Sequence, residues 1–285
     1  MTLQDLVVKN AEKFAKFEGK VIEITNENVF QEGNDELQNV MGSIIEEFLK
    51  PGSGIIGKEN LFELLEKVRS GKKCLILPEH YSNFDYPLII KFFKDLGEKG
   101  KELASACVAI AGIKLSETNP VISMMNNAYD TISIYPGRSL QNITDSKILE
   151  EETKKARLIN LASMRLMEEL RSNGRVVVVF PTGTRYRPGK PETKKALREI
   201  DSYIRTSDYM LLLSINGNCL EISKSGDMTQ DIVKEDKIIL QASEVIECKS
   251  FRENIISKLD DKADKKQSVV DEIMLRLEKM HNQNL

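Results

Sequence analysis

The chain is poor in the residues that build metal sites and disulfide frameworks. Two histidines, His80 and His281, occur among its 285 residues, which argues against a metal site with several histidine ligands. Its four cysteines lie far apart and form no C-x-x-C pair, so we expect free thiols in a reducing compartment. We therefore expect no resident metal ion.

Long hydrophobic segments are also missing. The most apolar runs, at residues 176–180 and 211–213, have the length of strands, whereas a membrane-spanning helix needs about 20 apolar residues. Residues 1–5 have neither the basic nor the apolar region of a signal peptide. We expect a cytoplasmic protein, or one of an organelle stroma, whose contact with membranes is peripheral.

Neither sign of charge dominates the sequence. There are 41 Lys and Arg residues against 44 Asp and Glu residues, a net charge of −3 at pH 7. This balance excludes a protein that binds nucleic acid through overall basicity, although local basic patches stay open. A chain of this length can bury a sizeable core, and at roughly 150 residues per domain it has room for two domains.

The hydrophobic pattern changes at about residue 72. Before it, apolar residues recur at helical spacing in residues 3–17, 37–48 and 61–68. After it, short apolar runs alternate with helical stretches, which is typical of crossover connections between parallel strands. We predict an α/β fold with a largely parallel central sheet flanked by helices. We place an N-terminal helical domain at residues 1–72 and the α/β domain at residues 73–285.

Individual elements of the α/β part can be placed from the same pattern. The expected strands are residues 74–77, 107–111, 132–135, 176–180 and 210–215, with further strands within 237–246. The expected helices are residues 84–96, 148–171 and 269–280. The segment Gly52 to Gly57 matches G-x-G-x-x-G, but a predicted helix precedes it instead of a strand. We therefore interpret it as a helix end and a loop.

The segment from Pro78 to Asp85 joins a predicted strand to a predicted helix. Catalytic groups often lie at the carboxyl ends of such strands. His80 has the chemistry of a general base, and Asp85 could fix its tautomer and stabilise the imidazolium. Alternatively, Ser82 and Asp85 form a helix capping box and His80 is a structural histidine. This segment alone leaves both interpretations open.

Basic side chains follow two further strands. The strand at residues 176–180 leads into a loop with Gly183, Arg185 and Arg187, and arginine is suited to binding phosphate or carboxylate groups. The backbone N–H groups of Gly183 and Thr184 could also serve an anion. An anion site is favoured here over a solvated basic loop. Arg138, after the strand at residues 132–135, is a weaker candidate.

Two absent motifs narrow the chemistry. The sequence has no G-x-x-x-x-G-K-[ST], which disfavours ordinary ATP chemistry, and no G-x-S-x-G, so there is no obvious serine nucleophile. A His–Asp pair without a protein nucleophile suggests that the substrate supplies the nucleophile. We therefore infer that the site transfers a group to a substrate hydroxyl while arginines hold a phosphate of the substrate.

Taken together, the two blocks resemble the glycerolipid acyltransferase superfamily, whose motifs read N-H-x-x-x-x-D and F-P-E-G-T-R. Here they stand as Glu79-His80-Tyr81-Ser82-Asn83-Phe84-Asp85 and Phe180-Pro181-Thr182-Gly183-Thr184-Arg185, about a hundred residues apart. The resemblance covers roughly residues 74–216. The chain is most similar to the soluble plastid-type glycerol-3-phosphate acyltransferases, whose block continues to a second arginine and a proline, as Arg187 and Pro188 do here.

The resemblance implies an O-acyltransferase of phospholipid synthesis. Its substrates would be glycerol-3-phosphate and the thioester of acyl carrier protein or of CoA, with no bound cofactor and no nucleic-acid partner. His80 and Asp85 would be the catalytic pair. The residues that the resemblance places at the substrate are Lys114, Arg138, Ser139, Gly183, Thr184, Arg185 and Arg187.

Two departures from the family motifs bear on the acceptor. Glu79 replaces the family's Asn and Thr182 replaces its Glu, and membrane-bound members that acylate lysophosphatidate usually keep that Glu. Acylation of lysophosphatidate or another lipid remains an alternative. So does a non-catalytic module that binds anions or nucleic acid through the basic patch between Arg185 and Arg198. The acyl donor, the chain length and the oligomeric state stay open.

Overall fold

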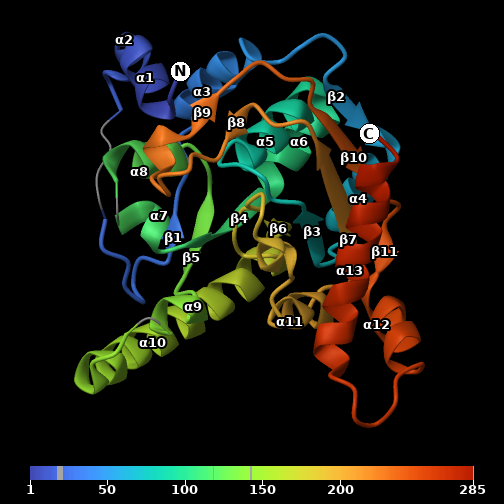
Figure 1. The fold of residues 1–285 in the computed structure, drawn as a ribbon. Coiled ribbons are helices and arrows are strands. Elements are labelled where there is room, and N and C mark those ends of the chain that lie inside the picture. Colours follow the sequence, from blue (N-terminus) through green and yellow to red (C-terminus); the bar gives the residue numbers. More distant parts are fainter. Residues whose placement is uncertain (18–21, 118, 142, 285) are drawn as a thin grey trace.

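A mostly parallel sheet forms the centre of the protein (Figure 1). The computed structural model describes residues 1–17, 22–117, 119–141 and 143–284. Within these residues the sheet has nine strands in the order β1-β5-β4-β6-β3-β7-β10-β2, with β11 also paired to β7. The strands are β1 (Phe30–Gln31), β2 (Gly54–Ile56), β3 (Cys74–Pro78), β4 (Cys107–Gly112), β5 (Thr131–Ile134), β6 (Val176–Val178), β7 (Tyr209–Asn216), β10 (Ile239–Ala242) and β11 (Ile246–Glu247).

Helices cover both faces of this sheet, and the side chains of its central strands alternate between the two faces. Cys74 and Ile76 of β3 point into one hydrophobic core, and Leu75 and Leu77 point into the other. The first core is closed by α1 (Leu3–Lys9), α2 (Ala11–Phe14), α3 (Asp35–Glu46), α4 (Lys58–Arg69), α5 (Asp85–Asp95), α6 (Glu98–Ala106) and α8 (Pro120–Asn126). The second is closed by α10 (Ser146–Ser172), α11 (Ile200–Arg205), α12 (Cys248–Ile256) and α13 (Lys265–Asn282). The predicted α/β architecture is confirmed.

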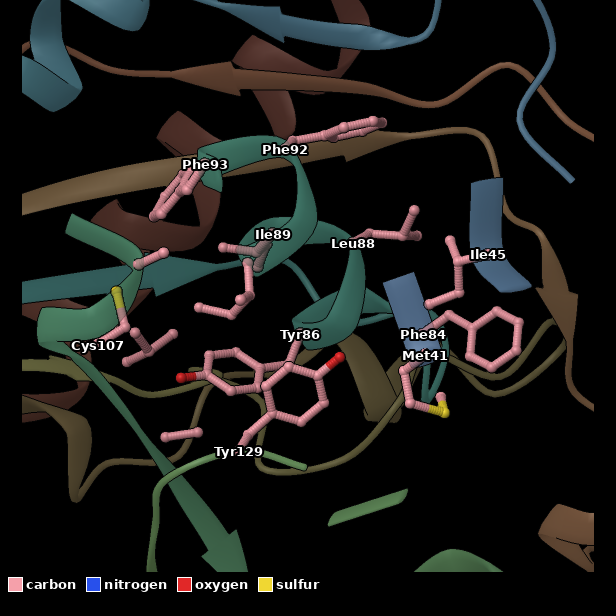
Figure 2. Close-up of a cluster of buried hydrophobic side chains, with 14 of the residues drawn as sticks. Met41, Ile45, Phe84, Tyr86, Leu88, Ile89, Phe92, Phe93, Cys107 and Tyr129 are labelled. Atoms are coloured by element: carbon pink, nitrogen blue, oxygen red, sulfur yellow. The ribbon is translucent and has the colours of Figure 1, made fainter. Parts of the chain in front are cut away.

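The helix after β3 is anchored in the first core. Figure 2 shows side chains of α5 gathered with Met41 and Ile45 of α3 and with Cys107 and Tyr129. The rings of Tyr86 and Tyr129 meet edge to face with centroids 5.2 Å apart. Burial of this apolar side of α5 fixes the helix that begins directly at Asp85.

The remaining elements are short. Lys114–Glu117 (α7) follows β4, and Gly137–Leu140 (α9) follows β5. A separate two-stranded sheet pairs β8 (Leu220–Glu221) with β9 (Ile232–Val233), and two 3₁₀ helices lie at Pro191–Lys194 and Met228–Gln230. Neither this small sheet nor α12 was among the expected elements.

We predicted an N-terminal segment made of helices alone, but it also contains two strands. Its strand β1 pairs antiparallel with β5 at one edge of the central sheet, and β2 pairs parallel with β10 at the other. The glycine-rich segment thus contains a strand, and Gly57 adopts a left-handed φ of 80° before α4. The division of the chain at residue 72 stays a prediction.

None of the helices in the described part of the chain is both long enough and apolar enough to cross a bilayer.

Candidate active site

The predicted site residues lie along the edge of the sheet that the strand ends form, which is not the edge formed by an outermost strand. Strands β3, β6, β4 and β5 are parallel neighbours, so their carboxyl ends meet at this edge. His80 follows β3, and the loop with Arg185 and Arg187 follows the adjacent β6. Lys114 follows β4, two strand spacings or roughly 10 Å from β3, and Arg138 follows β5, roughly 14 Å away. The topology therefore gathers these side chains along one line.

His80 and Asp85 are in direct contact. The His80 Nδ1 atom lies 2.9 Å from the Asp85 Oδ2 atom, and Asp85 is buried while the His80 side chain keeps 18% of its surface exposed. A carboxylate can only accept a hydrogen bond, so Nδ1 carries the proton and Nε2 holds the lone pair. The geometry suits a general base that presents Nε2 to a substrate.

The same carboxylate also builds the turn that carries His80. Asp85 accepts backbone hydrogen bonds from Tyr81 at 2.5 Å and Ser82 at 2.8 Å, and Ser82 Oγ donates to Asp85 Oδ1 at 3.0 Å. The N-cap of α5 is Phe84, which makes no side-chain capping bond. The two sequence interpretations of Asp85 therefore combine, because one carboxylate holds both the turn and the imidazole.

The loop after β6 holds His80 from a second side. The ring of Phe180 stacks on the imidazole with centroids 4.1 Å apart and an interplanar angle of 27°, and the Tyr186 N–H donates to the His80 carbonyl at 2.8 Å. Phe180 was not predicted as a site residue. Its place as the first residue of the second block is the one signal in the sequence that could have indicated it.

Gly183 shapes the loop after β6 through its backbone conformation. It has a left-handed φ of 58°, and an added Cβ would collide with the Leu197 side chain. Its N–H donates to the Phe180 carbonyl at 3.0 Å, so this group is already engaged within the turn, and its predicted service to an anion stays a prediction. Thr182 Oγ1 closes the next part of the turn by donating to the Thr184 carbonyl at 2.6 Å.

The two loop arginines differ in their surroundings. Arg185 is buried and its Nη1 pairs with the carboxylate of buried Asp231, which also accepts the Ser223 N–H at 2.9 Å. Arg187 is exposed. Part of the Arg185 guanidinium is therefore already engaged, and Arg187 is the arginine of this loop that faces solvent. Asp231 was not predicted from the sequence.

The three other predicted substrate residues lie farther along the edge. Lys114 and Arg138 are exposed, at the start of α7 and in α9. Ser139 is half-buried, and its N–H donates to the Pro136 carbonyl at 2.9 Å. They share the edge with His80 but belong to other strands.

A cavity of about 330 Å³ opens beside His80. The turn from His80 to Asp85, the candidate catalytic turn, and the loop after β6 form one wall, with Tyr81 and Tyr186 among the lining residues. The other wall comes from α13, which contributes Met274 and Leu275, and from the segment of Lys194. No pattern in the sequence indicated that α13 borders the site.

No metal centre accompanies the site within the described part of the chain, where His, Cys, Asp and Glu form no group of three or more that could hold a metal ion. All four cysteines are buried free thiols. Burial raises the pKa of Cys219 to about 11 and those of Cys74 and Cys107 to about 12. These thiols are therefore poor nucleophiles and poor metal ligands near neutral pH.

Comparison with known proteins covers this same region. The family model for acyltransferases matches residues 60–205, about half of the chain, including the His80–Asp85 turn and the loop after β6. No curated protein sequence matches the chain.

Proposed function

The chain belongs to the acyltransferase family, and we propose that it is a glycerol-3-phosphate O-acyltransferase. The observation that carries this proposal is the contact between His80 Nδ1 and Asp85 Oδ2, at a sheet edge where basic residues follow three neighbouring strands. A histidine held in this way activates a hydroxyl, and the nearby cations suit an acceptor that carries a phosphate.

The proposed reaction needs no protein nucleophile. Nε2 of His80 takes the proton of the glycerol hydroxyl as its oxygen attacks the thioester carbonyl. The tetrahedral intermediate then expels the thiolate of acyl carrier protein or CoA, and the imidazolium returns the proton to that sulfur. Asp85 stabilises the imidazolium between these two steps. The products are the acyl ester and the free thiol.

The arrangement around His80 suggests where each substrate lies. Strand β3 stands between β6 and β7, and the predicted phosphate residues are on the β6, β4 and β5 side. Helix α13 packs against β7, and the cavity lies between α13 and the wall formed by the His80–Asp85 turn and the loop after β6. We assign the acceptor to the first side and the acyl thioester to the cavity. His80 then lies between the two reacting groups.

An acceptor panel tests the proposed function. Purified protein is given acyl-CoA or acyl carrier protein thioester with glycerol-3-phosphate, lysophosphatidate or unphosphorylated glycerol. We expect turnover with glycerol-3-phosphate and a large loss with glycerol, since glycerol cannot use the basic residues. Turnover confined to lysophosphatidate would favour the alternative acceptor and overturn our proposal.

The basic patch between Arg185 and Arg198 is a poor candidate for nucleic-acid binding. Arg185 is paired with Asp231, and Arg198 Nε lies 2.7 Å from the Asp264 carboxylate. Both arginines thus face carboxylates that repel a phosphate backbone. We propose that the protein has no nucleic-acid partner. Salt-sensitive RNA binding without acyl transfer would contradict this.

Peripheral contact with an anionic bilayer is proposed for α10, which extends from the body of the protein (Figure 1). Its residues 153–167 include four basic and no acidic side chains. Leu158, Leu161 and Met164, three residues apart on one face, are 55%, 44% and 63% exposed. Apolar side chains among cations are typical of helices that lie on membrane surfaces.

Sedimentation with lipid vesicles tests this contact. We expect the protein to bind vesicles that contain phosphatidylglycerol, to bind vesicles of phosphatidylcholine alone more weakly, and to be released by salt. Replacing Leu158 and Met164 together by serine should weaken binding while acyl transfer to soluble substrates continues. Unchanged binding by this double variant would exclude α10 as the contact.

A further inference from the structure

A second histidine–carboxylate pair lies next to the catalytic one. Nδ1 of His281 is 2.9 Å from Oε2 of Glu79, and Glu79 is buried. The other carboxylate oxygen, Oε1, accepts a hydrogen bond from the Tyr81 hydroxyl at 2.8 Å. The N–H of Ile215 also donates to Oε2, at 2.9 Å. Both oxygens of the Glu79 carboxylate are therefore engaged, by partners from β7, the catalytic turn and α13.

This network ties the last turn of α13 to the edge of the sheet. The His281 carbonyl accepts a hydrogen bond from Nδ2 of Asn216, the last residue of β7, at 2.9 Å. The His281 ring also contacts the Tyr81 ring, with centroids 5.5 Å apart. An element about two hundred residues away in the sequence thus reaches the turn that carries the general base.

Glu79 and Tyr81 are the two chain neighbours of His80. The Glu79 N–H continues the sheet by donating to the Leu213 carbonyl at 3.0 Å, and the Tyr81 N–H donates to Asp85. The backbone N–H groups of both neighbours are therefore hydrogen-bonded, and the side chains of both neighbours contact His281. Any shift of His281 therefore acts on both neighbours of the catalytic residue.

From this geometry, and resting on the proposed role of His80, we propose that Glu79, Tyr81 and His281 are positioning residues for the general base. They make the C-terminal helix a required part of the active site. They do not touch the reacting atoms. Their effect is to hold the turn so that Nε2 of His80 keeps its distance from the acceptor hydroxyl, because small misplacements of a catalytic group are costly in rate.

The charges around Glu79 explain why a histidine faces it. A buried carboxylate needs a charged or hydrogen-bonding partner, and removing that partner leaves an uncompensated charge. Burial and then the Glu79 carboxylate raise the pKa of Tyr81 well above its ordinary range, so Tyr81 supplies a neutral O–H donor. The Lys194 ammonium lies over the rings of Tyr186 and Tyr81, 4.7 and 6.0 Å from their centroids. Of the groups named here, the His281 imidazole is therefore the basic one that contacts the Glu79 carboxylate directly.

Steady-state kinetics of His281 variants test the proposal. We expect His281→Ala to lower kcat by roughly 10- to 100-fold, the scale of a misplaced catalytic group, with KM for both substrates little changed. His281→Asn should restore most of kcat, because its amide N–H can replace the Nδ1–H donor. Asn282→Ala, at the exposed neighbouring position, is the matched control and should behave as wild type. Wild-type kcat in His281→Ala would overturn the proposal.

Coupling to Glu79 separates positioning from general stability. If His281 acts through Glu79, His281→Ala should cost little further kcat in a Glu79→Gln background, where the charge is gone. Equal losses in both backgrounds would contradict the proposal. Tyr81→Phe removes one hydroxyl and keeps the ring, so it should fold and should lower kcat several-fold. Tyr81→Phe therefore tests the network even in the case where His281→Ala makes α13 undock from the sheet.

The proposed function can fail separately from this inference. If His80→Ala retains acyl transfer, the general-base assignment fails, and with it the target of the positioning residues. If His80→Ala is inactive while His281→Ala and Tyr81→Phe turn over normally, only the positioning proposal is wrong. Hydrogen exchange of the amides of α13 shows, without any activity measurement, whether the His281→Ala helix remains docked.

Discussion

Arg185 and Asp231 form an ion pair that the fold hides from solvent. Their side chains are 8% and 1% exposed, and the pair joins the loop after β6 to the segment just before β9. Two buried charges stabilise each other only while both are present, and removing one partner of such a pair costs about 3–5 kcal/mol. Arg185 is therefore a structural residue of the loop as well as a candidate phosphate ligand.

The two loop arginines should respond differently to substitution. Arg185→Ala is expected to lower the free energy of unfolding by about 3–5 kcal/mol, since it strands the Asp231 charge. Arg187→Ala, at an exposed position, should leave the melting temperature unchanged and raise KM for glycerol-3-phosphate more than it lowers kcat. Lysine at position 187 should restore KM only in part, because an ammonium lacks the planar fork of arginine.

Varying each substrate separately decides between the two roles open to Arg187. If it docks acyl carrier protein instead, KM for that donor rises, salt weakens the effect, and kinetics with acyl-CoA stay normal. An unchanged KM for glycerol-3-phosphate in Arg187→Ala would remove this residue from the phosphate site.

His80→Ala should lower kcat by roughly 10²- to 10⁴-fold, the usual contribution of a general base. The side chain lies in a turn and is partly exposed, so the fold should survive, as circular dichroism and thermal melting can show. A folded His80→Ala protein with near-normal turnover would contradict the proposed mechanism.

Asp85→Asn should reduce both activity and stability. The carboxylate accepts two backbone N–H groups and the Ser82 hydroxyl besides its contact with His80, and an amide cannot accept all of these. We expect a loss of about 1–3 kcal/mol in unfolding free energy together with most of kcat. Ser82→Ala is the control, since it removes only the hydroxyl and should affect stability more than rate. Full activity in Asp85→Asn would leave this residue a purely structural role.

The central strands could be predicted because of where they lie. A strand such as β3, buried on both faces, is an uninterrupted apolar run, and β4, β6 and most of β7 are of the same kind. The strands β8 and β9 have two residues each, with one side exposed in each, so no periodic signal exists. In α12 only Cys248 and Phe251 are buried, too few to outline an amphipathic helix.

The site was predictable where it is local in sequence. His80 and Asp85 are five residues apart across a strand-to-helix turn, and their contact follows from that spacing. Asp231, by contrast, meets Arg185 across 46 residues, and His281 meets Glu79 across 202. These pairings depend on how β7, β9 and α13 pack, which no pattern within a single segment encodes. The exact partners of buried charges therefore required the structure.

The buried thiols lead to a prediction about pH. Folding raises the pKa of Cys74 from 9.0 to about 12 and that of Cys219 to about 11, in both cases chiefly through burial. A thiolate thus forms more easily in the unfolded chain. The corresponding stability is complete below pH 9 and is lost as the pH rises toward 12. The urea concentration at the midpoint of unfolding should therefore decrease as the pH is raised from 9 to 11.

Thiolate absorbance near 240 nm checks the cause of this loss. In the native protein it should stay low up to about pH 9, below the ionisation of tyrosine, whose phenolate absorbs at the same wavelength, whereas in urea the four thiols should titrate around their ordinary pKa of 9.0. At pH 8, a disulfide reagent should label the native thiols far more slowly than the unfolded ones, because the reactive thiolate is both scarce and buried. Rapid labelling of native protein would show that the core around Cys74 or Cys219 opens readily, and native thiol titration near pH 9.0 would contradict the raised pKa values.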